Sequence, residues 1–417
     1  MQQMPDADTY SSMRNRSPLE IYIHIPFCVK KCAYCDFLSF PAGKELQREY
    51  TDALLEEIRA FAAAQEGTRP VRSVFFGGGT PSLLPAEWIR EIMAQLREGF
   101  PLTGRPAASG EKMTDASAAP EAEITLEANP GTLTAEKLRA CREAGINRLS
   151  LGCQSVNDAQ LQILGRIHTA SQFFETFSMA RDAGFSNISA DLMSGLPGQN
   201  AEDWENSLRA VAGLHPEHIS AYSLIIEEGT PFWELYGEPS GKTAGRAAPP
   251  PLPDEETERR MYAMTETILA EYGYHRYEIS NYARPGWESV HNTGYWTGVE
   301  YVGFGLGAAS LLADRRMKNT ADLSAYLADP AGSRYTEEVL SEADRMAECM
   351  ILGLRLMRGV SEETFAGHFG KSLREVYGEV IRRHVRSGLL EEADGHIRLT
   401  GEGISLSNVV MRDFLPE

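Results

Sequence analysis

The chain has 417 residues, and its 40 Lys and Arg against 59 Asp and Glu give a formal net charge of −19. At about 150 residues per domain, this length predicts two or three structural units, with a core that needs no disulfides. So acidic a chain lacks the basic face of a general nucleic-acid-binding protein, and we expect no nucleic-acid partner.

The first 19 residues contain no apolar run of the kind found in secretory signals, and we interpret 1–19 as a disordered lead-in. No stretch approaches 18 uncharged apolar residues, so we expect no transmembrane segment and a cytoplasmic protein. Two segments rich in Ala, Pro, Ser and Gly, 101–122 and 237–256, are predicted to be a surface insert and a linker.

Strand and helix patterns alternate between residues 20 and 236. Thr134 and Ser171 stand where helix N-caps would. Six successive strand–helix units predict an α/β fold with a parallel sheet, either a partial (β/α)6 barrel or an open doubly wound sheet. The predicted strands are 21–25, 72–76, 123–127, 148–152, 188–193 and 218–224, and the predicted helices are 44–65, 85–98, 134–144, 171–183 and 201–213.

The rest of the chain follows a different pattern. Residues 257–339 form an extension with a helix near 257–272, a strand-like 274–280 and the run HNTGYW at 291–296. Its Gly-rich run 303–308 shows no clear strand, helix and distal acidic residue of a dinucleotide fingerprint, so we do not interpret it as one. Residues 340–417 predict helices followed by a hairpin, as in a winged-helix-like module. With 10 Lys and Arg against 13 Asp and Glu, that module favours packing or interaction over DNA binding.

Polar and Gly-rich motifs follow the predicted strands at their carboxyl ends. The second strand runs into Gly77-Gly78-Gly79-Thr80-Pro81 and the third into Glu127-Ala128-Asn129-Pro130. Because the carboxyl ends of parallel strands meet at one rim, we expect a functional site there.

The six cysteines do not form a disulfide pattern in a chain without a secretory signal. Cys28, Cys32 and Cys35 follow the first strand with the spacing C-x3-C-x2-C. Such thiolates could hold three irons of a [4Fe–4S] cluster and leave the fourth open, while a structural zinc site is the alternative. We interpret the others as buried thiols: Cys141, Cys153 and Cys349.

The run from Tyr22 to Cys35, with an aromatic residue before its last cysteine and the GGGTP motif after the next strand, resembles the radical S-adenosylmethionine (SAM) superfamily. More narrowly, it resembles the oxygen-independent coproporphyrinogen III oxidase-like branch. The resemblance implies a partial (β/α)6 barrel and a [4Fe–4S] cluster on Cys28, Cys32 and Cys35. It also implies SAM on the open iron, where an electron from the cluster cleaves it to methionine and a 5′-deoxyadenosyl radical.

The same resemblance implies which residues contact SAM. Each of these residues could instead have a purely structural role. The glycines could form a tight turn, the tyrosines could pack in the core, Glu127 could be a solvated carboxylate and Arg166 could lie on the surface. The implied SAM residues are Tyr22, Tyr34, Gly78, Gly79, Thr80, Glu127, Gln154, Arg166 and Asp191.

Two features separate the chain from the dehydrogenases of this branch. Phe37 stands where those enzymes carry a further cysteine, which puts decarboxylase activity in doubt. The HNTGYW run resembles the HNxxYW signature of the haem chaperones in the same branch. A neutral imidazole is a good haem ligand, and aromatic rings can flank the macrocycle, although a buried structural histidine is the alternative. The predicted haem residues are His291, Asn292, Tyr295 and Trp296.

The resemblance therefore predicts a haem chaperone that carries a [4Fe–4S] cluster and SAM and passes haem to an acceptor protein. A membrane-associated acceptor would bring this cytoplasmic chain to the membrane surface, and a homodimer is the alternative to a monomer. The competing functions are an oxygen-independent coproporphyrinogen III dehydrogenase and a radical SAM methyl or alkyl transferase.

Overall fold

The computed structural model describes residues 18–65, 69–103, 121–237 and 249–416. Most of the predicted lead-in 1–19, insert 101–122 and linker 237–256 therefore lies outside the described residues. Among the described residues, no helix combines the length and the apolar composition needed to cross a membrane.

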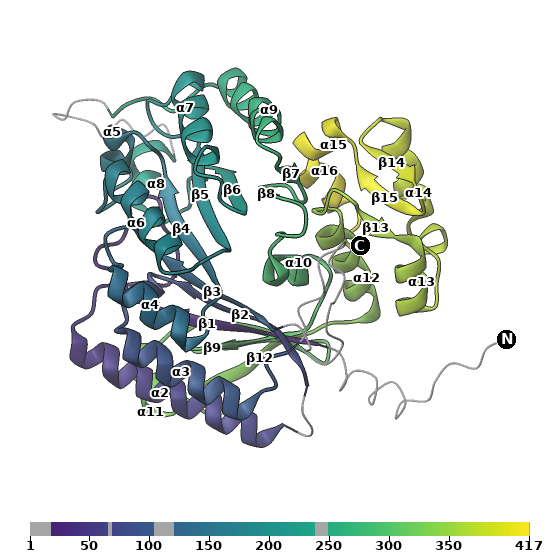
Figure 1. Cartoon of the computed structure of the whole chain (residues 1–417). Coiled ribbons are helices and arrows are strands. Elements are labelled where there is room, and N and C mark those ends of the chain that lie inside the picture. The colour runs from purple at the N-terminus through teal and green to yellow at the C-terminus, as the bar shows by residue number, and fades with distance from the viewer. Residues whose placement is uncertain (1–17, 66–68, 104–120, 238–248, 417) are drawn as a thin grey trace, which may run out of the picture.

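Six parallel strands form the centre of the molecule in the order β1 to β6 (Figure 1). Because neighbours along the chain are neighbours in the sheet, the fold is the partial barrel and not the doubly wound sheet. The strands are β1 (Leu19–Ile25), β2 (Val71–Gly78), β3 (Glu123–Ala128), β4 (Arg148–Gln154), β5 (Ile188–Ser194) and β6 (His218–Ser223), which confirms each predicted strand to within a few residues.

The crossover helices cover the outside of the barrel (Figure 1). The predicted cap Thr134 is confirmed, but Ser171 lies inside its helix, and Thr169 forms the N-cap with a capping box to Gln172. The N-cap is at Thr169 because the side-chain oxygen of this residue accepts a hydrogen bond from the backbone amide of Gln172, the third residue of the helix. The helices are α2 (Lys44–Ala64), α3 (Ala86–Gly99), α4 (Ala135–Ala144), α5 (Asp158–Ile163), α6 (Ala170–Asp182), α7 (Ala201–Ala212) and α8 (Pro231–Tyr236), with a 3-10 turn at Pro81–Leu83.

The extension after residue 255 adds strands to both edges of this sheet. β9 (Tyr301–Phe304) pairs with β1 and continues into β10 (Ala309–Leu312), β11 (Arg315–Asn319) and β12 (Arg334–Val339). At the other edge, β8 (Asn281–Ala283) pairs with β6, and the strand predicted at 274–280 shrinks to β7 (His275–Arg276). The helices of this part are α9 (Glu255–Glu271), α10 (Val290–Trp296) and α11 (Leu323–Ala328).

The last part of the chain has its own small sheet and its own core, centred on Met350, Phe365, Ile381 and Ile397. A helix pair followed by a hairpin matches the predicted winged-helix-like order. Its elements are α12 (Glu342–Gly353), β13 (Val360–Ser361), α13 (Glu362–Phe369), α14 (Leu373–Arg386), β14 (Leu390–Ala393), β15 (His396–Leu399), α15 (Gly401–Ser405) and α16 (Ser407–Arg412).

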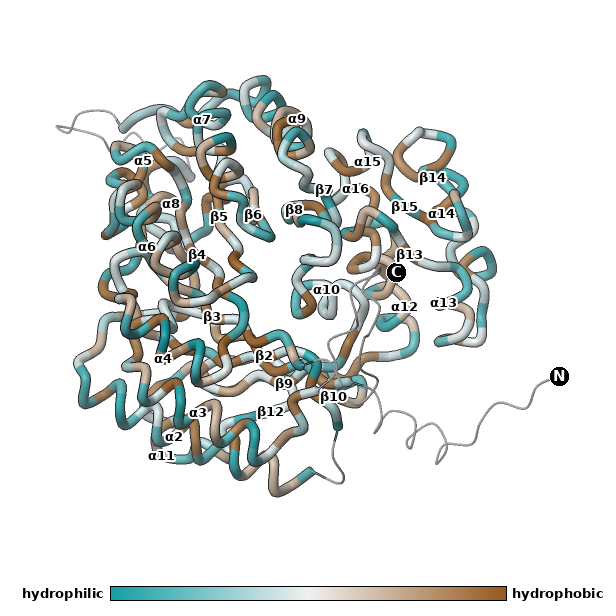
Figure 2. The backbone as a smooth tube through the Cα atoms, in the orientation of Figure 1, coloured by the Kyte–Doolittle hydropathy of each residue, from teal (hydrophilic) through white to brown (hydrophobic). Residues whose placement is uncertain are grey.

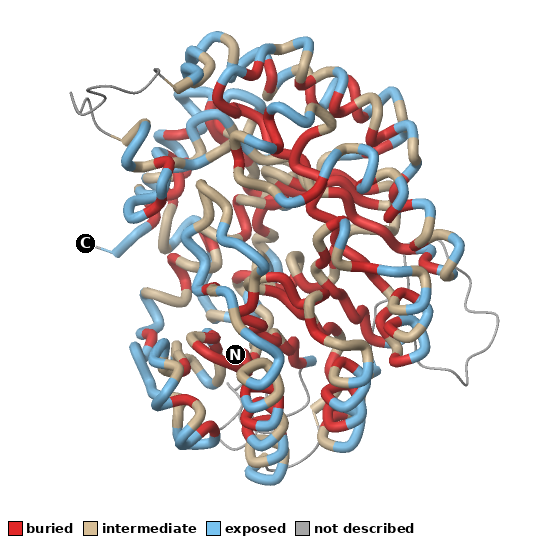
Figure 3. Tube along the Cα trace, turned by 90° about the vertical axis from the view of Figure 1, so that its left-hand side faces the viewer, coloured by how far each residue is buried: buried red, intermediate tan, exposed pale blue. Residues whose placement is uncertain are grey.

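The two faces of the barrel strands differ in chemistry. In β1, the side chains Ile21 and Ile23 belong to the core beneath the helices, while Tyr22 and His24 alternate with them on the other face. Helices α2 and α3 alternate between hydrophilic and hydrophobic residues (Figure 2), and the strands form the most buried layer (Figure 3). The large apolar core thus lies between sheet and helices, and the barrel interior is mainly polar.

Candidate cofactor site and the HNTGYW helix

The three motif cysteines lie on the loop that follows β1. Backbone bonds close this loop, because Cys28 N–H donates to the Phe40 carbonyl (3.1 Å) and Phe40 N–H to the Pro26 carbonyl (2.8 Å). The far side of the loop is tied to the barrel, since Ala33 N–H donates to the Leu164 carbonyl (3.0 Å). All three motif thiols are free and half-buried, at the positions Cys28, Cys32 and Cys35.

Soft thiolates at such spacing suit an iron–sulfur cluster. Within the described ranges, no three His, Cys, Asp or Glu side chains converge on one point as ligands of a single metal ion do. A [4Fe–4S] cluster does not need ligands that converge on one point, since each thiolate binds a different iron of the cube. The sequence predicts that the other three cysteines are buried thiols. This is confirmed for Cys141 and Cys153, whereas Cys349 is half-buried.

The GGGT run at the end of β2 packs tightly against the cysteine loop. A side chain at Gly79 would place its Cβ 2.7 Å from the Phe27 carbonyl oxygen, and one at Gly78 would come within 2.5 Å of the His24 ring. Gly78 also has φ +110°, which favours glycine. Contacts within the chain therefore suffice to explain both glycines, and their contact with SAM stays a prediction.

One pocket opens beside this loop. The Thr80 hydroxyl oxygen lies 3.6 Å from the Cys28 sulfur. The same oxygen accepts a hydrogen bond from the side-chain amide of Asn129 (3.0 Å). Asn129 belongs to the motif after the third predicted strand, but the sequence alone does not indicate a role for its side chain. The pocket is lined by Val29, Lys30, Cys32, Thr80, Asn129, Thr132, Arg166 and Ile167.

Arg166 lies at the centre of the rim and not on the outer surface. Its guanidinium is 3.9 Å from the Cys32 sulfur and donates to the Gly152 carbonyl (2.8 Å) and to the Asn129 side chain. Its Nε has no hydrogen-bond partner among the described residues. Burial raises the pKa of the neighbouring Tyr34 phenol, and Arg166 opposes that rise. Arg166 is thus placed to meet an anionic or polar ligand in the pocket.

Gln154 ends β4 in a left-handed backbone conformation, with φ +65°, which is uncommon for a residue other than glycine. Its amide oxygen accepts a hydrogen bond from the Tyr222 hydroxyl (2.9 Å). The predicted SAM residue Gln154 on β4 is therefore linked to Tyr222 on β6, a residue that the sequence did not assign to the SAM site.

Two predicted carboxylates lie inside the barrel below the rim. Asp191 accepts hydrogen bonds from the Ser150 hydroxyl through both oxygens (3.0 and 3.2 Å), and burial raises its pKa. Glu127 accepts a hydrogen bond from the Gly78 amide, yet burial and the charge of Asp191 raise its pKa to about 8. Glu127 is therefore no solvated carboxylate, and its protonation changes near neutral pH.

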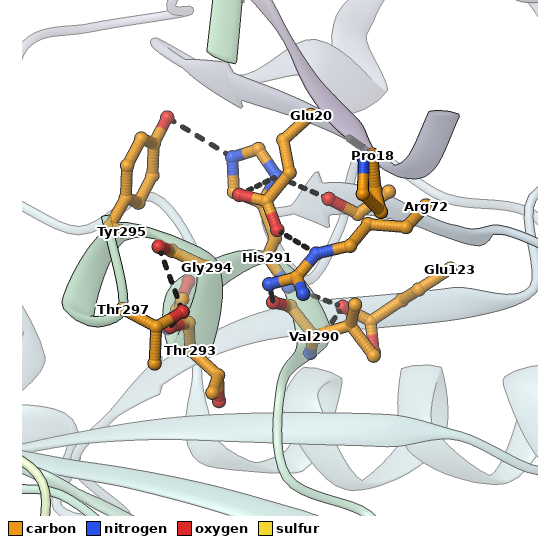
Figure 4. A network of polar contacts seen from close by, with 12 residues as sticks. Pro18, Glu20, Arg72, Glu123, Val290, His291, Thr293, Gly294, Tyr295 and Thr297 are labelled. Carbon is orange, nitrogen blue, oxygen red and sulfur yellow. Dashed lines mark hydrogen bonds and ion pairs between the residues drawn. The ribbon is translucent and has the colours of Figure 1, made fainter. Parts of the chain in front are cut away.

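The HNTGYW residues form helix α10, which lies against the inner face of the barrel (Figure 4). The His291 side chain is 1% exposed and both ring nitrogens are engaged: Nδ1 with the Ser73 hydroxyl (2.8 Å) and Nε2 with the Tyr295 hydroxyl (3.1 Å). The ring also stacks on Phe75 at 5.0 Å. Burial, Arg148 and Arg72 lower the pKa of His291 to about 3, so its imidazole is neutral.

Charged residues at the start of three strands hold the same helix in place (Figure 4). The Glu123 carboxylate accepts hydrogen bonds from the amides of Val290 (3.0 Å) and His291 (3.2 Å), at the positive end of α10. Arg72 pairs with the fully buried Glu20 at 2.7 Å and donates to the Val290 carbonyl (3.3 Å). We call this set, Glu20, Arg72, Ser73, Glu123 and His291, the floor network.

The other two predicted haem residues lie away from the floor network. Trp296 is half-buried beneath the Arg355 guanidinium, 4.3 Å from the ring centre, and its Nε1 has no hydrogen-bond partner among the described residues. Asn292 is half-buried as well. The structure therefore divides the motif: His291 and Tyr295 engage the barrel, and Trp296 meets the turn after α12.

Comparisons with known proteins agree with this architecture. Residues 22–211 match the model of the radical SAM superfamily, and residues 340–406 match that of the HemN C-terminal domain. The solved coproporphyrinogen III oxidase HemN from Escherichia coli superimposes with a TM-score of 0.76 at 22% identity, over 99% of this chain and 93% of that one. Fold and site thus define a radical SAM protein of the coproporphyrinogen III oxidase-like branch, and superfamily membership implies a [4Fe–4S] cluster and SAM.

Proteins of similar sequence narrow the assignment. The "Heme chaperone HemW" of Bacillus subtilis is 38% identical over 95% of this chain and 99% of its own length. That of Escherichia coli is 33% identical over 96% of this chain and 99% of its own length. The chain belongs to the HemW family.

Proposed function

We propose that this chain is a haem chaperone, a protein of radical SAM fold that binds haem and transfers it to an acceptor protein. The observation that carries the proposal is the near full-length similarity to proteins named haem chaperone HemW, 38% identical over 95% of this chain in one case. In support, the HNTGYW motif is intact on a single helix.

We propose Cys28, Cys32 and Cys35 as the cluster ligands, because they are free thiols on one loop beside the pocket. Of the predicted SAM residues, Thr80 and Arg166 line that pocket, and its charged side chains are Arg166 and Lys30. When bound, the cluster supplies the electron that cleaves SAM. The chain's own part is to orient SAM and to hold its cationic groups near the carboxylates of Glu127 and Asp191.

For haem we propose His291 as the iron ligand, with Asn292, Tyr295 and Trp296 beside the macrocycle. The neutral imidazole is the form that coordinates iron. Both of its nitrogens are already bonded, so ligation requires α10 to leave its place in the barrel. The haem-bound form therefore differs from the present one at α10, and the floor network is what must open.

We propose that the haem acceptor is a separate protein, membrane-associated or not, and that the chain works in the cytoplasm or at the membrane surface. These partner assignments follow from the chaperone role and share its test. A homodimer is the proposed assembly.

The test is a haem titration of the anaerobically reconstituted protein, followed by absorbance. Saturable binding near one haem per chain is expected, and His291→Ala should weaken it at least tenfold or change its spectrum. His368→Ala is the matched control, because that histidine is exposed on α13. Absence of specific haem binding would contradict the proposal. Conversion of coproporphyrinogen III to protoporphyrinogen IX, or release of S-adenosylhomocysteine, would favour the dehydrogenase or the transferase instead.

A further inference from the structure

Arg148, the first residue of β4, is a buried charge that neither the cluster site nor the HNTGYW motif uses. It is 2% exposed and faces the barrel interior, since Leu149 and Leu151 alternate with it in the outer core. The hydrogen bond of its side chain seen among the described residues is a long one, from Nη1 to the Thr125 hydroxyl (3.4 Å), and its Nε has no partner there. Burying a guanidinium without a direct counter-ion lowers the stability of a protein. The buried charge of Arg148 is therefore expected to have a role in this barrel.

The strand register places Arg148 just below the two carboxylates of the rim. In the register of β3 and β4, Thr125 lies opposite Arg148. The next inward-facing pair along the two strands is Glu127 opposite Ser150. Ser150 is also the residue whose hydroxyl binds Asp191 on β5. Arg148 is therefore a cation on the strand between the two strands that carry Glu127 and Asp191, and its field opposes the rise that desolvation causes in the pKa of both carboxyl groups.

The other ionisable groups near Arg148 do not compete for its charge. His218 on β6 and His291 on α10 are buried, and burial together with Arg148 lowers the pKa of each, which keeps them neutral. Burial likewise raises the pKa of Tyr277, which stays a phenol. The phenols that face the carboxylates, Tyr22 and Tyr222, are neutral for the same reason.

The carboxylates of the floor network have their partners without Arg148, although the Oε2 atom of Glu20 accepts no hydrogen bond among the described residues. Glu20 pairs with Arg72, and Glu123 receives the amides at the start of α10. Glu127 and Asp191 are carboxylates inside the barrel that make no ion pair with any of the described residues.

We propose that Arg148 is a positioning residue of the SAM site: its buried charge favours the anionic forms of Glu127 and Asp191 as SAM, cationic at its sulfonium and ammonium groups, enters the rim. The inference rests on the SAM site advanced under Proposed function. It adds to that site a residue that lies one inward-facing step along the strands from Glu127 and acts through the two carboxylates.

The experiment measures the dissociation constant of SAM by calorimetry on the cluster-loaded protein between pH 6.5 and 9. Wild-type affinity should rise with pH as Glu127 ionises. Arg148→Met should weaken binding about tenfold or more at pH 7 and move that rise upward by about one pH unit, since one pKa unit is a factor of ten. Arg148→Lys keeps the charge and Thr125→Val removes only the hydrogen bond, so both should stay within about threefold of wild type.

In a Glu127→Gln background, most of the effect of Arg148→Met should disappear, because the two residues act through one charge interaction. If Arg148→Met does not fold, Arg148→Gln carries the same expectation. Wild-type affinity and pH profile in the charge-removing variant would overturn the inference, as would equal losses in the Met and Lys variants with an unchanged pH profile. Failure of the wild type to bind SAM would instead overturn the proposed SAM site.

Discussion

The two ends of the barrel hold polar residues in opposite ways. At the rim, the strand ends and the cysteine loop leave groups facing a pocket, among them Arg166, whose Nε has no hydrogen-bond partner in the described part of the chain. At the other end, Glu20, Arg72 and Glu123 are bonded to one another or to α10, and His291 has no free nitrogen. The rim is thus preformed for a ligand, whereas the floor is closed and must change before it can bind one.

This difference matters because a polar barrel interior is itself unusual. Barrel interiors are normally filled by branched apolar side chains, whereas here the large core lies between sheet and helices. Buried polar groups specify one arrangement only while all their partners are present. The floor network therefore holds α10 in one seated position, and the proposed haem ligation requires α10 to leave it.

The largest effect is expected at the rim. Cys32→Ala removes one of the three proposed ligands, and the reconstituted protein should lose nearly all of its iron and sulfide, from about four of each per chain. Cys349→Ala, outside the pocket on α12, should keep the full content. Iron and sulfide analysis after anaerobic purification decides the matter, and a cluster of normal content in the Cys32 variant would rule out this ligand set.

The next largest effect is expected at the floor. Arg72→Met leaves the fully buried Glu20 without its ion pair, which should lower the free energy of unfolding by about 3–5 kcal/mol. Arg259→Met, in an exposed ion pair on α9, should cost less than about 0.5 kcal/mol. Urea unfolding of both variants compares the two pairs. Similar small losses in both would show that the floor network is not closed as described.

A smaller change should loosen the floor without removing a charge. A methyl group at Gly294 would meet the Glu20 carboxylate at 1.9 Å, so Gly294→Ala should destabilise the seated helix by about 1–3 kcal/mol. Because a displaced α10 is the proposed haem-binding state, haem affinity should rise as stability falls. Gly43→Ala, with open space around it, is the control. Stability loss together with weaker haem binding would argue against displacement.

The smallest expected effect concerns pH. The pKa of Glu127 is about 8 in the folded protein and 4.5 for the free side chain, so the folded state binds the extra proton between these values. Stability should therefore fall as pH rises through this window, by at most about 1.4 kcal/mol per pH unit from this group. Glu127→Gln should flatten the slope in thermal or urea unfolding of the protein without SAM. An unchanged slope would show that Glu127 is already ionised at neutral pH.

Much of the fold was predictable because its signals are local. Alternating apolar residues placed each barrel strand, and the C-x3-C-x2-C spacing located the loop at the rim. The edge strands β8 and β9 were not predictable in this way, since each is short and is stabilised by pairing with a strand more than 60 residues away.

The site was less predictable where it depends on distant partners. The sequence singled out His291, but not that Ser73, 218 residues earlier, would engage its ring. The sequence contains no sign of a role for Arg148, in the fourth predicted strand, or for Asn129, after the third, because burial and the neighbouring strands determine what they contact. Residue type and spacing thus located the rim, and only the packed structure showed that the floor is closed.

The most direct test of the account is hydrogen exchange at α10 with and without haem. We predict that the amides of Val290 and His291, now bonded to Glu123, exchange faster in the haem-bound protein, while those at the centre of β4 do not change. Stoichiometric haem binding with α10 as protected as before would contradict the account, since His291 could not then be the iron ligand.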